Sequence, residues 1–220
     1  MYSPTSVHGR RKSTFFFPFS IIVTQIKMSL RLYCPFLERL YLDRRSYLLS
    51  ARAVQMVQQY FDTINVRGTG SLDDVQVYAF LKESTNLKDR EIDAVFDAFD
   101  LDGDGCIDFD EFYLMICILI AVYNGEQKQF LFRHSRTCFD LLDADGNGSI
   151  SRTEFETLGF LFGYSEKAVK QIFLDFEIAD DQELDFDDFR MFIIAAIDTE
   201  DEFEKKRLEM LKSKKQCVIL

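Results

Sequence analysis

Apolar residues recur at helical spacing on either side of short polar stretches. In the clearest case, four apolar residues stand at positions i, i+3, i+4 and i+7: Ile92, Val95, Phe96 and Phe99. This spacing predicts an amphipathic helix that opens after Asn86. A polar stretch, 100–111, follows it, and a second apolar run begins at Phe112. The order predicts a helix, a polar loop and a second helix.

The polar stretch 100–111 reads DLDGDGCIDFDE and holds six carboxylates. Like charges repel at this spacing, and a hard cation with oxygen ligands relieves the repulsion. The stretch fits the calcium loop of the EF-hand, a helix–loop–helix unit, at each constrained position. The predicted ligands are the side chains of Asp100, Asp102 and Asp104, the carbonyl oxygen of Cys106, Asp108 through water, and two oxygens of Glu111. Gly105 takes the sharp turn, and Ile107 points inward so that two loops can pair.

A second stretch, DADGNGSISRTE at 143–154, repeats the pattern in register. Its predicted ligands are Asp143, Asp145, Asn147, Ser149, Ser151 and Glu154. Phe139 and Phe155 flank it as Phe96 and Phe112 flank the first loop. A twelve-residue pattern met twice between helical flanks is a specific signal. We therefore expect two calcium ions (Ca²⁺).

Two further stretches keep the frame but lose ligands. NVRGTGSLDDVQ at 65–76 has Arg67 at the third position, which puts a cation where a cation should bind. EIADDQELDFDD at 177–188 has Ala179 at that position and ends on Asp188, which is shorter than the usual glutamate. We interpret both as structural units that pair with the two calcium loops.

The spacing of the four loops predicts an all-α fold of two lobes, each with one calcium loop, one degenerate loop and short loop-pairing strands. The loops begin at 65, 100, 143 and 177, so the long interval separates two close pairs. The N-terminal lobe is expected over 29–123 and the C-terminal lobe over 124–197. Residues 1–28 are expected to be a disordered extension rather than a signal peptide, because no small-residue cleavage site follows the apolar run.

Charge and composition narrow the function classes. The net charge is −11, and the acidic excess lies between 51 and 200, whereas both ends of the chain are basic. Such a core disfavours nucleic acid and favours metal ions or basic peptides. The five cysteines show no paired spacing, which argues against a disulfide framework or a zinc site. No catalytic motif is present, so we expect no enzyme.

The apolar run FYLMICILIAVY at 112–123 must be covered on all sides. Twelve residues are too few to span a bilayer. Two interpretations stay open, a helix buried between the lobes and a surface that a partner covers. The chain has 23 Phe against six Met, which favours a shape-specific interior and a dedicated partner over a promiscuous sensor.

The C-terminal segment 198–220 reads as a charged helical tail that ends in CVIL. Cys217, two aliphatic residues and Leu220 match a prenylation box whose last residue favours a geranylgeranyl group. Lysines and an arginine precede it, so the tail could attach the protein to a membrane surface by a lipid and basic charge together. A chance match of four residues is the alternative.

Three segments outside the loops resemble one family: RLYCPFLERLYLDRRSYLLSARAV at 31–54, DEFYLMICILIA at 110–121 and QFLFRHSRTCFDLLDADG at 129–146. They are similar to the cytoplasmic EF-hand subunit of the sperm cation channel CatSper, over about residues 29–197. The resemblance implies a CatSper zeta-like small subunit and the CatSper pore-forming subunits as partners. It also implies a cytoplasmic place at the membrane of the sperm flagellum, and calcium entry that responds to calcium and pH.

Two groups of residues are candidates for a pH response. His134 is the only histidine in the resembling region and is the candidate pH switch, although a helix histidine with satisfied hydrogen bonds is the alternative. Clustering of the loop carboxylates, which raises their pKa values, is the other route. Two further function classes stay open, a calcineurin-B-like regulatory subunit of a phosphatase or kinase and a membrane-tethered calcium buffer.

Overall fold

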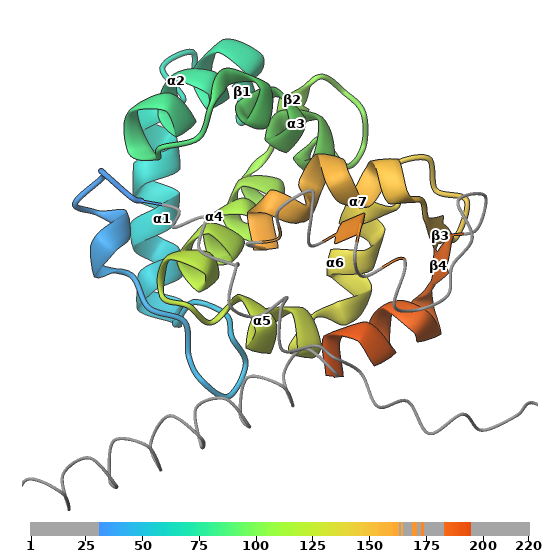
Figure 1. Ribbon diagram of the computed structural model, residues 1–220. Helices are drawn as coiled ribbons and strands as arrows, with labels where there is room; N and C mark the ends of the chain where they lie inside the picture. Colours follow the sequence, from blue (N-terminus) through green and yellow to red (C-terminus); the bar gives the residue numbers. More distant parts are fainter. Residues whose placement is uncertain (1–30, 163, 165–168, 171–172, 174–182, 195–220) are drawn as a thin grey trace, which may run out of the picture.

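The computed structural model describes residues 31–162, 164, 169–170, 173 and 183–194 (Figure 1). The expected extension 1–28, the charged tail 198–220 and its Cys217 lie outside the described residues. The degenerate loop 177–188 is described only from residue 183 onward. No helix within the described ranges has both the length and the hydropathy that crossing a bilayer requires.

The first half of the chain forms two consecutive helix–loop–helix units. Its elements in order are η2 (Leu37–Arg39), α1 (Ala51–Ile64), β1 (Leu72–Asp73), α2 (Asp74–Ser84), α3 (Asp89–Phe99), β2 (Cys106–Ile107) and α4 (Phe109–Tyr123). β1 and β2 pair antiparallel, with Leu72 opposite Ile107. These short strands join the degenerate loop 65–76 to the loop 100–111. Both inward residues of the pair are fully buried.

In the residues that the structure describes, the second half also has a helix–loop–helix unit and a pair of short strands. Its elements are α5 (Gln127–Arg133), α6 (Ser135–Leu142), β3 (Ser149–Ile150), α7 (Arg152–Leu158), η3 (Gly159–Phe162), β4 (Leu184–Asp185) and a helix described over 186–194. β3 and β4 pair antiparallel, with Ile150 opposite Leu184. The all-α class with short loop-pairing strands is confirmed.

The helix α3 begins later than its hydrophobic spacing indicated. It begins at Asp89 with Lys88 at the N-cap position, and not directly after Asn86. The side-chain oxygen of Asn86 accepts a hydrogen bond from the backbone N–H of Arg31 at 2.6 Å. That oxygen holds the N-terminal segment instead of capping the helix.

The helix α4 lies in the middle of the molecule, between α1–α3 and α5–α7 (Figure 1). Its residues Met115–Ala121 are all buried. Phe112 near its start packs against Phe61 of α1 and Phe80 of α2, with ring centroids 5.3 and 5.2 Å apart. Of the two interpretations of the run 112–123, burial inside the molecule is therefore the one observed. Buried side chains of both halves form one hydrophobic cluster.

The segment before α1 connects the two halves. Arg133 Nε donates to the carbonyl oxygen of Arg45 at 3.0 Å, and the ring of His134 contacts the carbonyl oxygen of Ser46 at 2.7 Å. At its other end the segment pairs Leu32 with Thr85, at the end of α2. Residues far apart in the sequence thus hold the second half against the N-terminal segment.

Candidate metal centres

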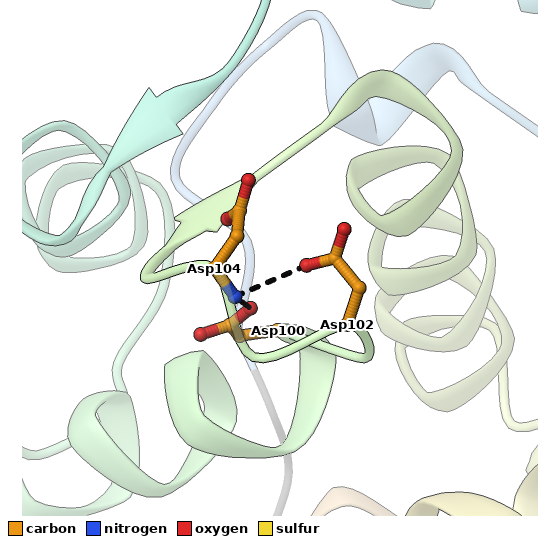
Figure 2. A group of neighbouring side chains, drawn as sticks. All are labelled: Asp100, Asp102 and Asp104. Carbon is orange, nitrogen blue, oxygen red and sulfur yellow. Dashed lines mark hydrogen bonds between the residues drawn. The ribbon is translucent and has the colours of Figure 1, made fainter.

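In the loop 100–111, three aspartates surround the turn between α3 and β2 (Figure 2). Asp100 and Asp102 accept hydrogen bonds from the backbone N–H of Asp104 at 3.0 and 3.1 Å. The other oxygen of Asp100 accepts from the N–H of Gly105 at 3.0 Å. Gly105 has φ +81°, a left-handed conformation that favours glycine. The backbone amides therefore hold the carboxylates in place around the turn.

Glu111 closes this loop from the first turn of α4. One of its oxygens accepts from the N–H of Leu101 and the other from the N–H of Asp108, both at 2.8 Å. Asp108 in turn accepts from the N–H of Glu111 at 2.9 Å, which completes a capping box at the start of α4. The carboxylate that is expected to bind the ion with two oxygens is thus already turned back over the loop.

Burial raises the pKa of Glu111, which is only 7% exposed. The two backbone N–H groups that it accepts from act in the opposite direction, and the nearby charges of Asp108 and Asp102 raise the pKa further. Removing a charged carboxylate from water is unfavourable unless a cation compensates it. The loop therefore has an unbalanced buried negative charge at the position where the ion is expected.

The loop 143–154 has the same arrangement. Asp143 accepts from the backbone N–H groups of Asn147 and Gly148, at 3.1 and 2.9 Å. Glu154 accepts from the N–H groups of Ala144 and Ser151, at 2.9 and 2.7 Å. Ser151 caps α7, as Asp108 caps α4.

The donor sets fit a calcium ion. In each loop, one carboxylate oxygen from each of three residues lies within 4.8 Å of the other two. The residues are Asp100, Asp102 and Asp104 in the first loop, a group that does not include Glu111, and Asp143, Asp145 and Glu154 in the second. Calcium–oxygen distances of about 2.5 Å put two ligands of one ion at most about 5 Å apart. The carbonyl oxygens of Cys106 and Ser149, expected as further ligands, belong to β2 and β3. An all-oxygen set with carboxylates is the chemistry that calcium prefers.

The degenerate loop 65–76 is closed by its own side chains. Arg67 forms an ion pair with Asp73, so a guanidinium group neutralises a carboxylate of the loop. Gln76 accepts from the N–H of Asp73 at 3.1 Å and donates to the carbonyl oxygen of Ile64 at 2.9 Å. Asn65 accepts from the N–H of Thr69 at 3.3 Å. The loop keeps the shape of a calcium loop through internal hydrogen bonds and an internal cation.

In the degenerate loop 177–188, the described residues place Asp185 as a helix cap, which accepts from the N–H of Asp188 at 2.8 Å. Ala179 lies outside the described residues. Glu183 contacts the partner loop, where it accepts a hydrogen bond from Asn147 Nδ2 at 3.2 Å and one from Ser149 Oγ.

His134 lies at the junction of α5 and α6, away from both loops. Its ring stands 4.7 Å from the ring of Phe130, measured between centroids. Its Nε2 can donate to the carbonyl oxygen of Ser46 in the neutral and in the protonated state, because a carbonyl accepts from either. This contact holds the two halves together.

Comparison with known families agrees with this geometry. A model described as an EF-hand domain pair matches residues 55–117, and a model described as an EF hand matches residues 136–160. The chain contains EF-hand calcium-binding domains. It is a calcium binder of the EF-hand type, and the matched residues hold the helix–loop–helix units around the loops 65–76, 100–111 and 143–154.

Among curated proteins, the EF-hand chain is similar to troponin C isoform 2 of Caenorhabditis elegans, with 26% identity over 64% of this chain and 89% of that protein. It is 26% identical to calcium-dependent protein kinase 5 of Plasmodium falciparum over 66% of this chain, which is 25% of the kinase. It is 30% identical to guanylyl cyclase-activating protein 1 of Gallus gallus over 49% of this chain and 54% of that protein. The chain thus spans about a quarter of the kinase and about half of the cyclase activator.

Sequence reasoning missed two features of these EF-hand loops. The ninth loop residue caps the following helix in all four units: Asp73, Asp108, Ser151 and Asp185. The capping-box spacing, with a glutamate or glutamine three residues later, could have indicated three of these caps. The contact of Glu183 with the partner loop had no sequence signal, because the seventh position of a loop supplies only its backbone.

Proposed function

We propose that the protein is a non-enzymatic calcium sensor that takes up two calcium ions and regulates a flagellar membrane calcium channel as a cytoplasmic auxiliary subunit. The observation that carries the calcium part is the pair of loops in each of which three carboxylates offer oxygens within 4.8 Å of one another. The resemblance of 129–146 to the EF-hand subunit of CatSper supports the channel part. The partners would be a CatSper zeta-like small subunit and the CatSper pore-forming subunits.

A groove between α2 and α3 is the partner surface that we propose. It has a volume of about 480 Å³ and is lined by Asp74, Val75, Tyr78, Ile92, Asp93, Phe96 and Asp97. Three of these residues are aspartates, none is basic, and Val75 is 66% exposed. An apolar floor with an acidic rim fits an apolar side chain between lysines or arginines. A buffer would not need such a surface.

The pH dependence that we propose acts through proton competition at the loops. Calcium ligands must be deprotonated, so protons weaken calcium binding. In the first loop, Glu111 is the residue that we propose for this competition, because burial raises its pKa. His134 is the other candidate, although its bond to the carbonyl oxygen of Ser46 can form in both protonation states. We further propose that lipid attached to Cys217 and the basic tail hold the protein at a membrane surface.

The proposal is tested by calcium titration calorimetry at about pH 6.5 and about pH 7.5, alone and with a CatSper zeta-like partner. We expect two ions, bound more tightly at the higher pH, and an affinity that the partner changes. The double variant Asp93→Asn/Asp97→Asn should weaken partner binding and leave the calcium stoichiometry intact. Asp62→Asn on α1 is the matched control, since Asp62 is exposed and does not line the groove.

Binding that neither pH nor the partner changes would refute the channel role and leave a buffer. A pull-down at saturating calcium distinguishes the channel subunit from a calcineurin-B-like regulatory subunit. Capture of a phosphatase or kinase in place of channel subunits would favour a calcineurin-B-like regulatory subunit. A His134→Gln protein with unchanged pH dependence would remove this histidine from the explanation.

A further inference from the structure

The structure places a residue of one EF-hand against the calcium loop of the other. The antiparallel pairing of Ser149 with Asp185 brings the residue before β4, Glu183, over the loop 143–154. Its Oε2 accepts from Asn147 Nδ2 at 3.2 Å and from Ser149 Oγ. We propose that Glu183 is a positioning residue that orients the amide of Asn147, so that its Oδ1 faces the ion. This inference rests on the proposed calcium load of the loop 143–154.

The need for positioning comes from the chemistry of the amide group. Asparagine has one oxygen that can bind a cation and one NH₂ group that repels it. Nδ2 of Asn147 donates to Asp145 at 3.2 Å and to Glu183 at the same distance, so both N–H groups have acceptors. Its Oδ1 accepts from the N–H of Ser149 at 2.8 Å, and it shares the single hydroxyl proton of Ser149, whose Oγ lies 2.7 Å away, with Glu183. The amide therefore has a defined orientation before any ion arrives.

The first calcium loop does not need this support. The equivalent residue there is Asp104, and either of its two oxygens can bind the ion. The loop 100–111 also holds six carboxylates, whereas 143–154 holds three. Glu183 is exposed, so water and salt screen its charge. Its effect is therefore expected mainly through its two hydrogen bonds.

The test compares Glu183→Ala with the matched control Asp187→Ala in the full chain. Asp187 is also exposed, lies four residues away, and shows no hydrogen bond to the loop 143–154 in the described part of the structure. Both proteins carry Glu111→Gln, so that calorimetry reports the loop 143–154 alone. Glu183→Ala should weaken calcium binding about tenfold, as loss of an outer-shell partner of a ligand does. Asp187→Ala should change it less than about twofold, and Glu183→Gln, which keeps an acceptor oxygen, should lie between the two.

A second readout needs no metal. In the calcium-free protein, the side-chain amide resonances of Asn147 should shift in Glu183→Ala and stay in place in Asp187→Ala. Equal calcium affinities of Glu183→Ala and Asp187→Ala would overturn the inference and leave the proposed function intact. Equal losses in Glu183→Gln and Glu183→Ala would overturn positioning by hydrogen bonds. A Glu111→Gln protein that binds no calcium would instead overturn the second ion of the proposed function.

Discussion

The substitution Glu111→Gln should remove one calcium ion and leave the fold in place. The degenerate loop 65–76 shows what a glutamine does at this position, because Gln76 is its twelfth residue, as Glu111 is the twelfth residue of the loop 100–111. Gln76 accepts from the N–H of Asp73 and donates to the carbonyl oxygen of Ile64. A glutamine at position 111 can make the same two bonds, to the N–H of Asp108 and the carbonyl oxygen of Phe99.

The magnitudes follow from the contacts of Glu111. The N–H of Leu101 loses its acceptor, which costs about 1 kcal/mol of the free energy of unfolding. The calcium-free protein also loses a buried negative charge, which partly offsets that cost. The loop loses one negative charge and a carboxylate that binds with two oxygens. Its affinity for calcium should therefore fall about 100-fold, which is about 2.8 kcal/mol of binding free energy.

Calorimetry of four proteins tests this reasoning. At the affinity of the parent, the parent should bind two ions, Glu111→Gln and Glu154→Gln one each, and the double variant none. Circular dichroism and urea unfolding of the calcium-free proteins supply the control for folding. Calcium binding by the double variant as tight as that of the parent would refute the ligand assignment. A Glu111→Gln protein that is unfolded without calcium would refute the argument from Gln76.

Three further predictions follow from other contacts. Arg67→Ala should lower the free energy of unfolding in urea by less than about 1 kcal/mol, because its ion pair with Asp73 is exposed. If calorimetry showed that this variant binds an additional calcium ion, the structural role of the loop 65–76 would be contradicted. The raised pKa of Glu111 means that folding favours its protonated form, so this stabilisation is present at low pH and is lost as the pH rises through the raised pKa. Calcium binds the ionised form of Glu111, so the calcium affinity of the loop 100–111 should fall as the pH drops through that pKa. The measurement uses a Glu154→Gln protein, in which the other loop binds calcium only weakly. An affinity that does not depend on pH would contradict the prediction. Burial raises the pKa of Cys117 to about 11, so an alkylating reagent at about pH 8 should modify the part-exposed Cys106 and spare Cys117 in the native protein, as mass spectrometry can show.

The fold was predictable where the signal is local. A calcium loop is specified by residues within one stretch of twelve, so Asp100–Glu111 and Asp143–Glu154 could be located from spacing alone. The inward residues Ile107 and Ile150 likewise predicted the strand pairs that the structure shows. These features depend on neighbours in the sequence, and the EF-hand geometry leaves few alternatives.

Features that depend on distant residues were not predictable. The contact of Arg133 with the carbonyl oxygen of Arg45 joins residues 88 positions apart, and no periodicity indicates it. The run 112–123 predicted that α4 must be covered, but an apolar helix does not identify what covers it. Asn86 has the properties of a helix cap, and it was misassigned because its tertiary partner Arg31 could not be seen in the local pattern.

The burial of α4 has a consequence for how a calcium signal would spread. The exit helix of a calcium loop is commonly the element that turns when the ion binds in a sensor. Here that helix is enclosed from Met115 to Ala121 and contacts α1, α3, α5 and η3. It cannot turn unless both halves of the core repack, so an opening at one loop disturbs the packing of both halves. Calcium at 100–111 should therefore slow amide hydrogen exchange in the second half of the chain as well as the first.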